Sequence, residues 1–234
     1  MKQLLFCLLI PLFSLSQEKK EYPFKGDFNL GLSYYQNVET TLMLINNGSL
    51  RYKVGEYEIK FTNELALLSK LGEEGSVNNG EQKLKWNLKP KNLDIFISSA
   101  HLYDIKQSIK KRFTNEVGIN FILKKNFEAG AALLNEDETN LENIQKNINR
   151  LSGKLNYTIN IGKKIKINSK NDYRPNIKKF GDFAFDTELD FIIEVNKYWE
   201  ITMNNKLKYT SYPATGIPEI NYVGINKITY NFWW

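Results

Sequence analysis

The sequence predicts an all-β protein: a single transmembrane antiparallel up-and-down β-barrel of about 12 strands. Apolar and polar residues alternate along nearly the whole chain, the last strand ends in aromatic residues, and the first residues resemble a secretion signal. A wall that separates lipid from a polar interior produces this alternation, with a period of two residues on each strand.

The C-terminal strand carries the clearest pattern. From Gly224 onward, alternate residues are apolar and end in aromatics, with Asn226 as the polar exception, while Lys227 and Asn231 point the other way. A strand of this kind suits the lipid-facing wall of a barrel. We expect its outward residues to be the signal read by the barrel-assembly machinery: Ile228, Tyr230, Phe232 and Trp234.

The N-terminus predicts a cleaved signal peptide over residues 1–16. Lys2 precedes a short apolar run over residues 4–13, and small residues follow at Ser14 and Ser16. The run is too short for a spanning helix, although an N-terminal anchor is the alternative. Residues 17–25 would form a short periplasmic segment and residues 26–234 the outer-membrane barrel. Cys7 lies inside the signal, so the mature chain is expected to use no disulfide or thiolate chemistry.

Composition narrows the function classes. No segment after residue 17 approaches 18 consecutive apolar residues, yet 13% of the residues are aromatic. The net charge of +6 is spread along the chain, so no nucleic acid partner is expected. No cofactor, metal-ligand spacing or phosphate-binding glycine loop is predicted.

Strand by strand, the alternation predicts twelve elements. The first four set Leu, Tyr, Phe and Trp against Asn, Ser, Lys and Glu, as in the strand with Tyr57, Ile59 and Phe61. The next three are less polar on the inner face, and the seventh has the weakest pattern. The last five alternate clearly, with Lys, Asp and Glu inward. The predicted strands cover residues 28–34, 41–53, 57–67, 83–88, 93–103, 113–123, 127–134, 150–159, 165–174, 182–195, 199–209 and 224–234.

The connections are expected to alternate in length. Short ones lie near Gly55, Lys89, Lys125, Gly162 and Asn196, and longer ones over residues 70–81, 104–112, 135–146, 175–181 and 211–220, with a short exception near Asn37. Short turns on the side of both termini indicate a periplasmic end. Near-helical spacing of apolar residues also allows a short helix over residues 137–147.

Outward aromatics collect near both ends of the predicted strands, as in the two girdles of a membrane barrel. Trp86, Tyr157 and Trp199 represent the short-turn end, and Tyr103, Phe183 and Tyr209 the opposite end. A soluble β-sandwich, the alternative fold, has no reason to form such girdles.

Inward charges of both signs predict the character of the lumen. Symmetric turns would place Arg174 opposite Asp182, Lys170 opposite Asp186 and Lys166 opposite Asp190, and would build a ladder from Lys170 through Asp186 to Lys206. A register shift by two residues would rearrange these pairs. The predicted lumen residues are Arg51, Glu58, Lys60, Glu64, Lys83, Lys85, Lys154, Lys166, Lys170, Asp172, Arg174, Asp182, Asp186, Glu188, Asp190, Lys206 and Lys208.

Two interpretations of this lumen stay open. Interlocked charges fill a narrow barrel, or they line a small hydrated pore, and twelve strands lie between packed eight-stranded barrels and open porins. The many long side chains favour the narrow or occluded lumen. Outside the barrel, the basic segment Lys106–Arg112 either contacts phosphates of outer-membrane glycolipid or is a solvated loop.

A hydrolase is the alternative function class. Ser99 and His101, the only histidine, share a lipid-facing strand phase, but their order reverses that of outer-membrane phospholipases and no glycine follows. Residues two apart on a strand are separated by roughly 6.6 Å, which is long for a nucleophile–base hydrogen bond. The acidic residues of the tenth strand are explained more simply by ion pairs. No catalytic residue is therefore predicted.

The mature chain resembles the salt-induced outer-membrane protein family, the domain of unknown function 481 family. The opening strand Gly26–Leu32, the serial hairpins, the proline-containing loop Ser211–Pro218 and the ending Ile228–Phe232 carry the resemblance. Trp233 and Trp234 extend beyond the usual end, and Gln36–Thr41 departs from the usual Gly-Asn-Thr turn. The resemblance implies an outer-membrane location and no known catalytic residues.

Together these observations predict an integral outer-membrane barrel of a Gram-negative bacterium, either a non-catalytic envelope protein or a narrow pore. Its expected partners are membrane lipid and glycolipid, and the barrel-assembly machinery during biogenesis. The sequence predicts neither the solute nor the oligomeric state.

Overall fold

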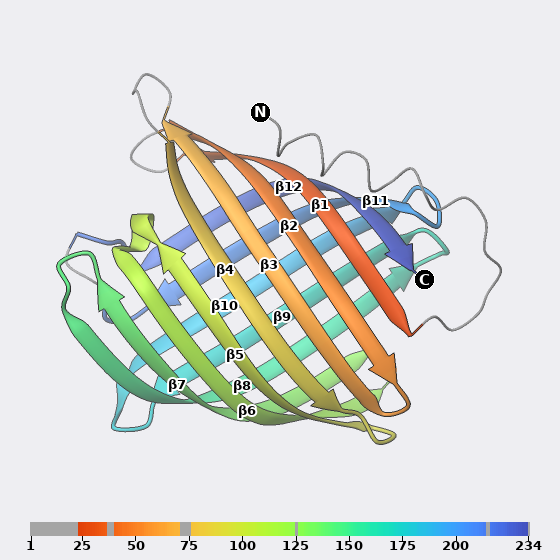
Figure 1. Ribbon diagram of the computed structural model, residues 1–234, viewed down its shortest axis with the longest axis horizontal. Helices are drawn as coiled ribbons and strands as arrows, with labels where there is room; N and C mark the ends of the chain where they lie inside the picture. The colour runs from red at the N-terminus through yellow and green to blue at the C-terminus, as the bar shows by residue number, and fades with distance from the viewer. Residues whose placement is uncertain (1–22, 37–39, 71–75, 125, 214–215, 234) are drawn as a thin grey trace.

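The computed structural model describes residues 23–36, 40–70, 76–124, 126–213 and 216–233, which form a closed barrel of twelve strands (Figure 1). The predicted signal peptide, the connection near Asn37 and Trp234 lie outside the described residues. The strands are β1 (Phe24–Gln36), β2 (Thr40–Val54), β3 (Tyr57–Lys70), β4 (Ser76–Leu88), β5 (Leu93–Asp104), β6 (Ile109–Lys124), β7 (Phe127–Asn140), β8 (Gln145–Ile161), β9 (Ile165–Asn176), β10 (Lys179–Glu194), β11 (Trp199–Thr210) and β12 (Ile220–Trp233).

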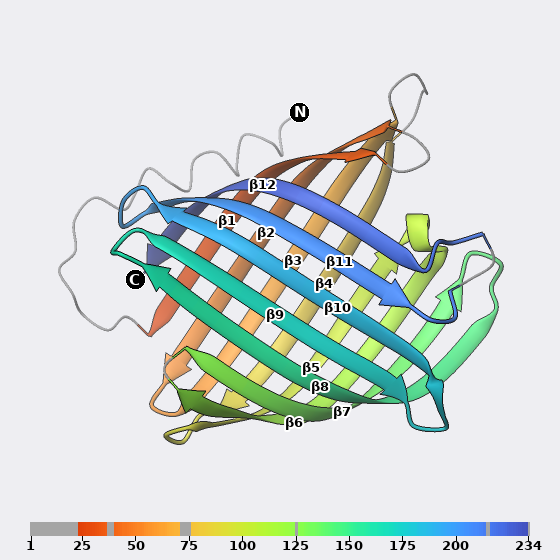
Figure 2. The same ribbon diagram turned by 180° about the vertical axis from the view of Figure 1, so that it is seen from behind.

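Each strand pairs antiparallel with its neighbours in sequence, and β1 pairs with β12 to close the sheet. The closing register joins Lys25 to Trp233 at one end and Leu32 to Asn226 further along, so the first and last described strands lie side by side (Figure 2). Closure leaves no unpaired sheet edge, which is the condition for a strand wall to stand in lipid. The predicted fold class is confirmed.

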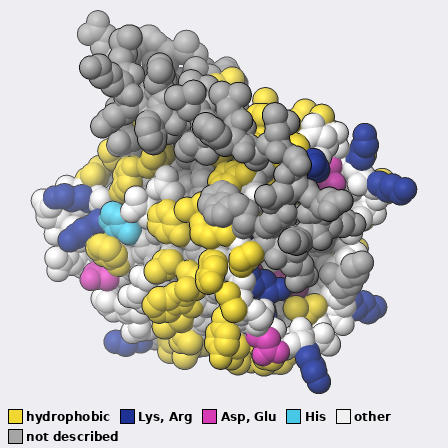
Figure 3. All heavy atoms as spheres, turned by 45° about the vertical axis from the view of Figure 1, so that its right-hand side comes forward, with side chains coloured by type: hydrophobic (Ala, Val, Ile, Leu, Met, Phe, Trp, Pro, Cys, Tyr) yellow, Lys and Arg dark blue, Asp and Glu magenta, His cyan; other side chains and the backbone are white. Residues whose placement is uncertain are grey.

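The side chains follow the predicted alternation. On β1, Leu30 is 50% exposed and Leu32 54%, while Ser33, of opposite phase, is 1% exposed. Since a strand directs successive side chains to opposite faces, the apolar set covers the outside and the polar set fills the inside. Hydrophobic side chains gather over the wall, with charged side chains mainly around them (Figure 3).

The outer face also carries polar side chains besides Asn226. Several form hydrogen bonds along the wall: Thr187 donates to Asn171 at 2.8 Å, and Tyr222 donates to Asn205 at 2.6 Å. Mutual hydrogen bonds lower the cost of leaving an amide against lipid. The outward phase also includes Asn46, Asn63, Gln82, Ser99, Asn115, Asn135 and Asn149.

The possible helix over residues 137–147 is wrong. Strand β7 continues to Asn140, β8 begins at Gln145, and a tight turn joins them with Asn143 at a φ of 63°. Beyond Asn135 both faces of β7 are polar, because Glu136 and Glu138 face the lumen while Asp137 is exposed outside. The two-residue pattern of hydrophobicity therefore disappears although the strand continues.

Most of the predicted long connections are shorter than expected. β9 ends at Asn176 and β10 begins at Lys179, and β5 and β6 are joined by a 3-10 helix, η2 (Ile105–Gln107), and Ser108. Ladder hydrogen bonds continue through polar residues, so strands extend past the point where hydrophobic alternation ends. Of the predicted long loops whose residues are largely described, only Ser211–Glu219 stays long.

Candidate functional site

The lumen is the candidate functional site, because the strand phase turns all the predicted lumen residues toward it. On β3, for example, Glu58, Lys60 and Glu64 have the phase opposite to the exposed Ile59 and Phe61.

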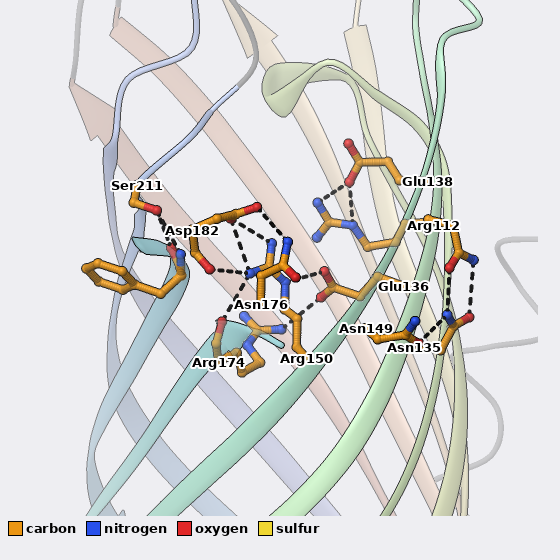
Figure 4. Close-up of polar contacts among 12 residues, drawn as sticks. Arg112, Asn135, Glu136, Glu138, Asn149, Arg150, Arg174, Asn176, Asp182 and Ser211 are labelled. Atoms are coloured by element: carbon orange, nitrogen blue, oxygen red, sulfur yellow. Dashed lines mark hydrogen bonds and ion pairs between the residues drawn. The ribbon is translucent and has the colours of Figure 1, made fainter. Parts of the chain in front are cut away.

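An arginine cluster lies on β6–β10 and contains Arg112, Arg150, Arg174, Glu136, Glu138 and Asp182 (Figure 4), together with Asp186 on β10. The Arg150 side chain is 5% exposed; its Nε lies 2.8 Å from a carboxylate oxygen of Glu136 and an Nη atom 3.3 Å from Asp182. It also donates to the carbonyl oxygen of Arg174 at 3.1 Å. The guanidinium thus joins β7, β8, β9 and β10 from inside.

The other two arginines continue the cluster. Arg174 pairs with Asp186 and lies 3.5 Å from Glu136, and Arg112 pairs with Glu138. The sequence prediction named Arg174, Asp182 and Asp186 but not Glu136 or Glu138, because the seventh strand was expected to end at Leu134. Arg150 has the inward phase in the sequence, which was the available signal for it.

The predicted pairing across β9, β10 and β11 is wrong by two residues. Asp186 lies opposite Asp172 and Lys208, whereas Lys170 lies opposite Glu188 and Glu188 opposite Lys206. A short β9–β10 turn, a bulge between Lys179 and Phe183, and a four-residue β10–β11 connection set this register. The ladder that forms runs Lys170–Glu188–Lys206, with Lys170 Nζ 3.3 Å from Glu188.

One ion pair crosses the lumen rather than following the wall. The ammonium of Lys206 on β11 lies 3.4 Å from a carboxylate oxygen of Glu64 on β3, although β12, β1 and β2 separate these strands around the barrel. Two side chains that meet in this way narrow the aqueous cross-section at their level. The phase of these residues was predicted, but their contact depends on the barrel's cross-section, which the alternation does not specify.

A second narrowing element is Phe96, an inward aromatic that is 2% exposed. Lys85 and Lys154 place their ammonium groups 4.1 and 4.7 Å from the ring centroid, so both cations contact the ring. Space for the ring comes from Gly118, where a Cβ would lie 2.7 Å from Phe96. Glu116 in turn pairs with Lys154 and lies 3.8 Å from Lys83. The inward phase of Phe96 could be read from the sequence, but its pairing with Gly118 depends on the strand register.

A small cavity of about 150 Å³ lies in the lumen beside η2. Part of its wall is apolar, formed around a buried cluster of Met43, Ile45 and Ile225. Its charged lining consists of Glu64, Glu81, Asp104, Lys106, Lys206 and Lys208. The η2 turn is held beside it because the Asp104 carboxylate accepts a hydrogen bond from the Gln107 amide, and the Ile105 amide donates to Asn79.

The predicted basic loop Lys106–Arg112 is mostly ordered into other elements. β6 begins at Ile109, and Arg112 faces the lumen and pairs with Glu138. Lys110 and Lys111 are exposed at the strand end, where Lys110 donates to Asn143 at 2.8 Å. Only part of this segment is therefore free to meet a ligand outside the barrel.

Ser99 and His101 lie on the outer phase of β5. The imidazole stacks on the Phe113 ring with centroids 4.7 Å apart, and no hydrogen bond joins it to Ser99 among the described residues. His101 thus belongs to an aromatic group with Tyr103 and Phe113. Within the described ranges, no three His, Cys, Asp or Glu side chains are grouped to hold a metal ion, and no helix is long and apolar enough to cross a membrane.

Solved structures show where else this fold occurs. The NanC porin matches with a TM-score of 0.57 and 8% identity, over 88% of this chain and 99% of that one. An outer membrane channel from Pseudomonas putida F1 matches with a TM-score of 0.51 and 10% identity, over 93% of this chain and all of that one. At these identities the likeness concerns the fold. No family model matches the chain, and no curated protein matches it. The chain therefore has the barrel fold of outer-membrane porins and channels.

Proposed function

We propose that this protein is a narrow outer-membrane pore for small hydrophilic solutes and ions, without catalytic activity. The observation that carries the proposal is the ion pair between Lys206 and Glu64, which crosses a lumen lined by charges of both signs. Polar, charged walls favour hydrated solutes, while the Lys206–Glu64 pair and Phe96 exclude large ones.

Single-channel recording in planar bilayers tests the pore. Wild-type protein is expected to give small unitary currents, and the double variant Glu64→Gln/Lys206→Gln larger ones, because the crossing pair is removed. The matched control is Lys166→Gln/Glu194→Gln, which neutralises a pair 3.3 Å apart between the neighbouring strands β9 and β10. A wild-type current as large as that of an open porin would contradict the proposal, as would silence in all three proteins.

The location belongs to the same proposal. A cleaved signal would deliver the chain to the periplasm, the assembly machinery would recognise Ile228, Tyr230, Phe232 and Trp234, and both termini would face the periplasm. The outward apolar band and the closed sheet support this placement. Membership in the salt-induced outer-membrane protein family stays a prediction.

Cell fractionation tests the location. The protein is expected in the outer-membrane fraction, with faster gel mobility before boiling than after, because a closed barrel stays compact in detergent. Protein recovered from the soluble periplasm with unchanged mobility would contradict the placement.

A further inference from the structure

A groove of about 510 Å³ lies in the outer wall over β4–β8, with Ile177 of the β9–β10 connection at its edge. One side of it is apolar and exposed, with Leu84, Trp86, Ile97, Val117 and Leu133 between 41% and 53% exposed. The volume lies within the range of ligand pockets, roughly 300–1,000 Å³. A lipid-facing hollow of this size needs an occupant, because empty space beside the wall forfeits dispersion contacts.

The other side of the groove is a polar row formed by Ser99, Asn115, Asn135 and Asn149. The strand register pairs Ser99 with Asn115, Asn115 with Asn135, and Asn135 with Asn149, so the four lie in one line across β5–β8. The line spans about 14 Å, from the usual spacing between strands. Asn135 donates to Asn149 at 3.0 Å and to Asn147 at 2.9 Å (Figure 4).

The depth of the polar row limits what its occupant can be. On β5 and β6 the aromatic side chains His101 and Phe113 lie one outward position closer to the η2 end than Ser99 and Asn115. Aromatic girdles mark the interface, so this part of the row lies just inside the hydrocarbon boundary. Lipid linkages, rather than charged headgroups, occupy that depth, and neutral amides can both donate to and accept from them.

Charge at the strand ends favours one class of lipid. Lys110 and Lys111 are exposed on β6 beyond Phe113, although Asp137 and Glu142 are exposed nearby. Lysines above an amide-lined groove match a lipid that carries both phosphate and amide-linked acyl chains. A second copy of the chain fits less well, because two concave faces placed together would leave a void.

We propose that the groove binds an acylated, phosphorylated glycolipid of the outer leaflet. Its acyl linkages contact the polar row, one chain lies along Leu84 and Val117, and its phosphate lies toward Lys110 and Lys111. This inference rests on the proposed outer-membrane location, with η2 toward the exterior.

Native mass spectrometry of the full mature barrel, refolded with lipid A as the probe, tests the site. Wild type is expected to retain one glycolipid, and Asn115→Leu/Asn135→Leu to retain about tenfold less, as expected when about 1.4 kcal/mol of hydrogen bonding is lost. The matched control is Asn63→Leu/Gln82→Leu, an outward amide pair joined at 3.3 Å outside the groove, which should keep the lipid. Phosphatidylethanolamine should be retained less than lipid A.

A second measurement does not depend on the folding of the double variant. A dye on Ser99→Cys should be quenched by spin-labelled lipid A, and a dye on Ile201→Cys, on the outward phase of β11, should be quenched less. The proposal would be overturned if wild type retained no lipid A, if the control variant lost as much lipid A as Asn115→Leu/Asn135→Leu, or if phosphatidylethanolamine were retained equally well. Equal quenching at both dyes would also overturn it. So would a dimer of the wild-type protein that Asn115→Leu/Asn135→Leu abolishes. Fractionation and bilayer currents report separately on location and pore, so their failure is distinguishable from failure of the groove.

Discussion

Arg150 shows how single residues hold this barrel from inside. Its guanidinium is buried against two carboxylates and a backbone carbonyl of three other strands, whereas the Arg51 side chain is 44% exposed. A buried charge that loses its partner keeps its desolvation cost, while an exposed pair is screened by water. An arginine ion pair therefore contributes more to the free energy of unfolding at Arg150 than at Arg51.

We expect Arg150→Leu to destabilise the barrel by about 3 kcal/mol, the lower end for a broken buried pair, since Arg174 still neutralises Glu136. Arg51→Leu is the control, expected to change stability by less than about 1 kcal/mol because Lys89 stays 2.8 Å from Glu58. Urea unfolding of protein in lipid vesicles, followed by tryptophan fluorescence, measures both. Equal effects of the two changes would contradict this account.

At the scale of elements, alternation predicted the strands well where one face meets lipid. It failed at β7 and β8 beyond Asn135 and Asn149, where both faces are polar although the backbone ladder continues. The strand register could not be predicted from the sequence either. The inward phase of Asp186 and Lys206 followed from the alternation, but the turn lengths that determine their cross-strand partners did not. The phase of the candidate site residues was thus predictable, and their contacts were not.

Strand alternation itself can be tested on β8. Leu155→Arg places a cation on the outer face and should destabilise the barrel by about 2–4 kcal/mol if its site lies near the bilayer midplane. Asn156→Arg, one residue further, faces the lumen beside Glu128 and should be tolerated. Vesicle unfolding and yield of heat-modifiable protein measure the difference, and similar losses for both would argue against the assigned phase.

The packing of β6 against β7 predicts a glycine effect. A Cβ at Gly118 would lie 2.5 Å from that of Ala132 and 2.8 Å from the Ala131 carbonyl oxygen, so Gly118→Val should cost about 1–3 kcal/mol from overpacking. At Gly153 the nearest atom would be 4.0 Å away, and Gly153→Val should leave stability unchanged or raise it slightly. The same unfolding assay separates them, and a larger loss at Gly153 would contradict the packing described.

At the scale of the whole molecule, closure depends on the β1–β12 seam, which joins the two ends of the chain. Asn29 and Thr229 face each other there, and the threonine hydroxyl donates to the asparagine side chain. Every other strand pair is a hairpin of sequence neighbours. The two strands of the seam are the furthest apart in sequence, so we expect this pair to form last during folding.

A disulfide across the seam should lock the barrel. Asn29→Cys/Thr229→Cys in the mature chain, which we expect to contain no other cysteine, should oxidise and keep fast gel mobility after boiling without reductant. The control Asn29→Cys/Ile225→Cys pairs positions that are not opposite each other, since Ile225 does not lie in register with Asn29. Loss of fast mobility in both oxidised proteins would contradict the closing register.

The tight connection between β9 and β10 has a consequence for the surface of the cell. Only Ile177 and Lys178 separate the two strands there, and β7 and β8 are joined by residues 141–144. Antibodies and bacteriophages bind protruding loops, and among the described connections at this rim only Ser211–Glu219 is long. In the orientation proposed, these short connections face the outside of the cell. A bacterium that displays many copies of the protein would then expose few protruding loops to antibodies or bacteriophages.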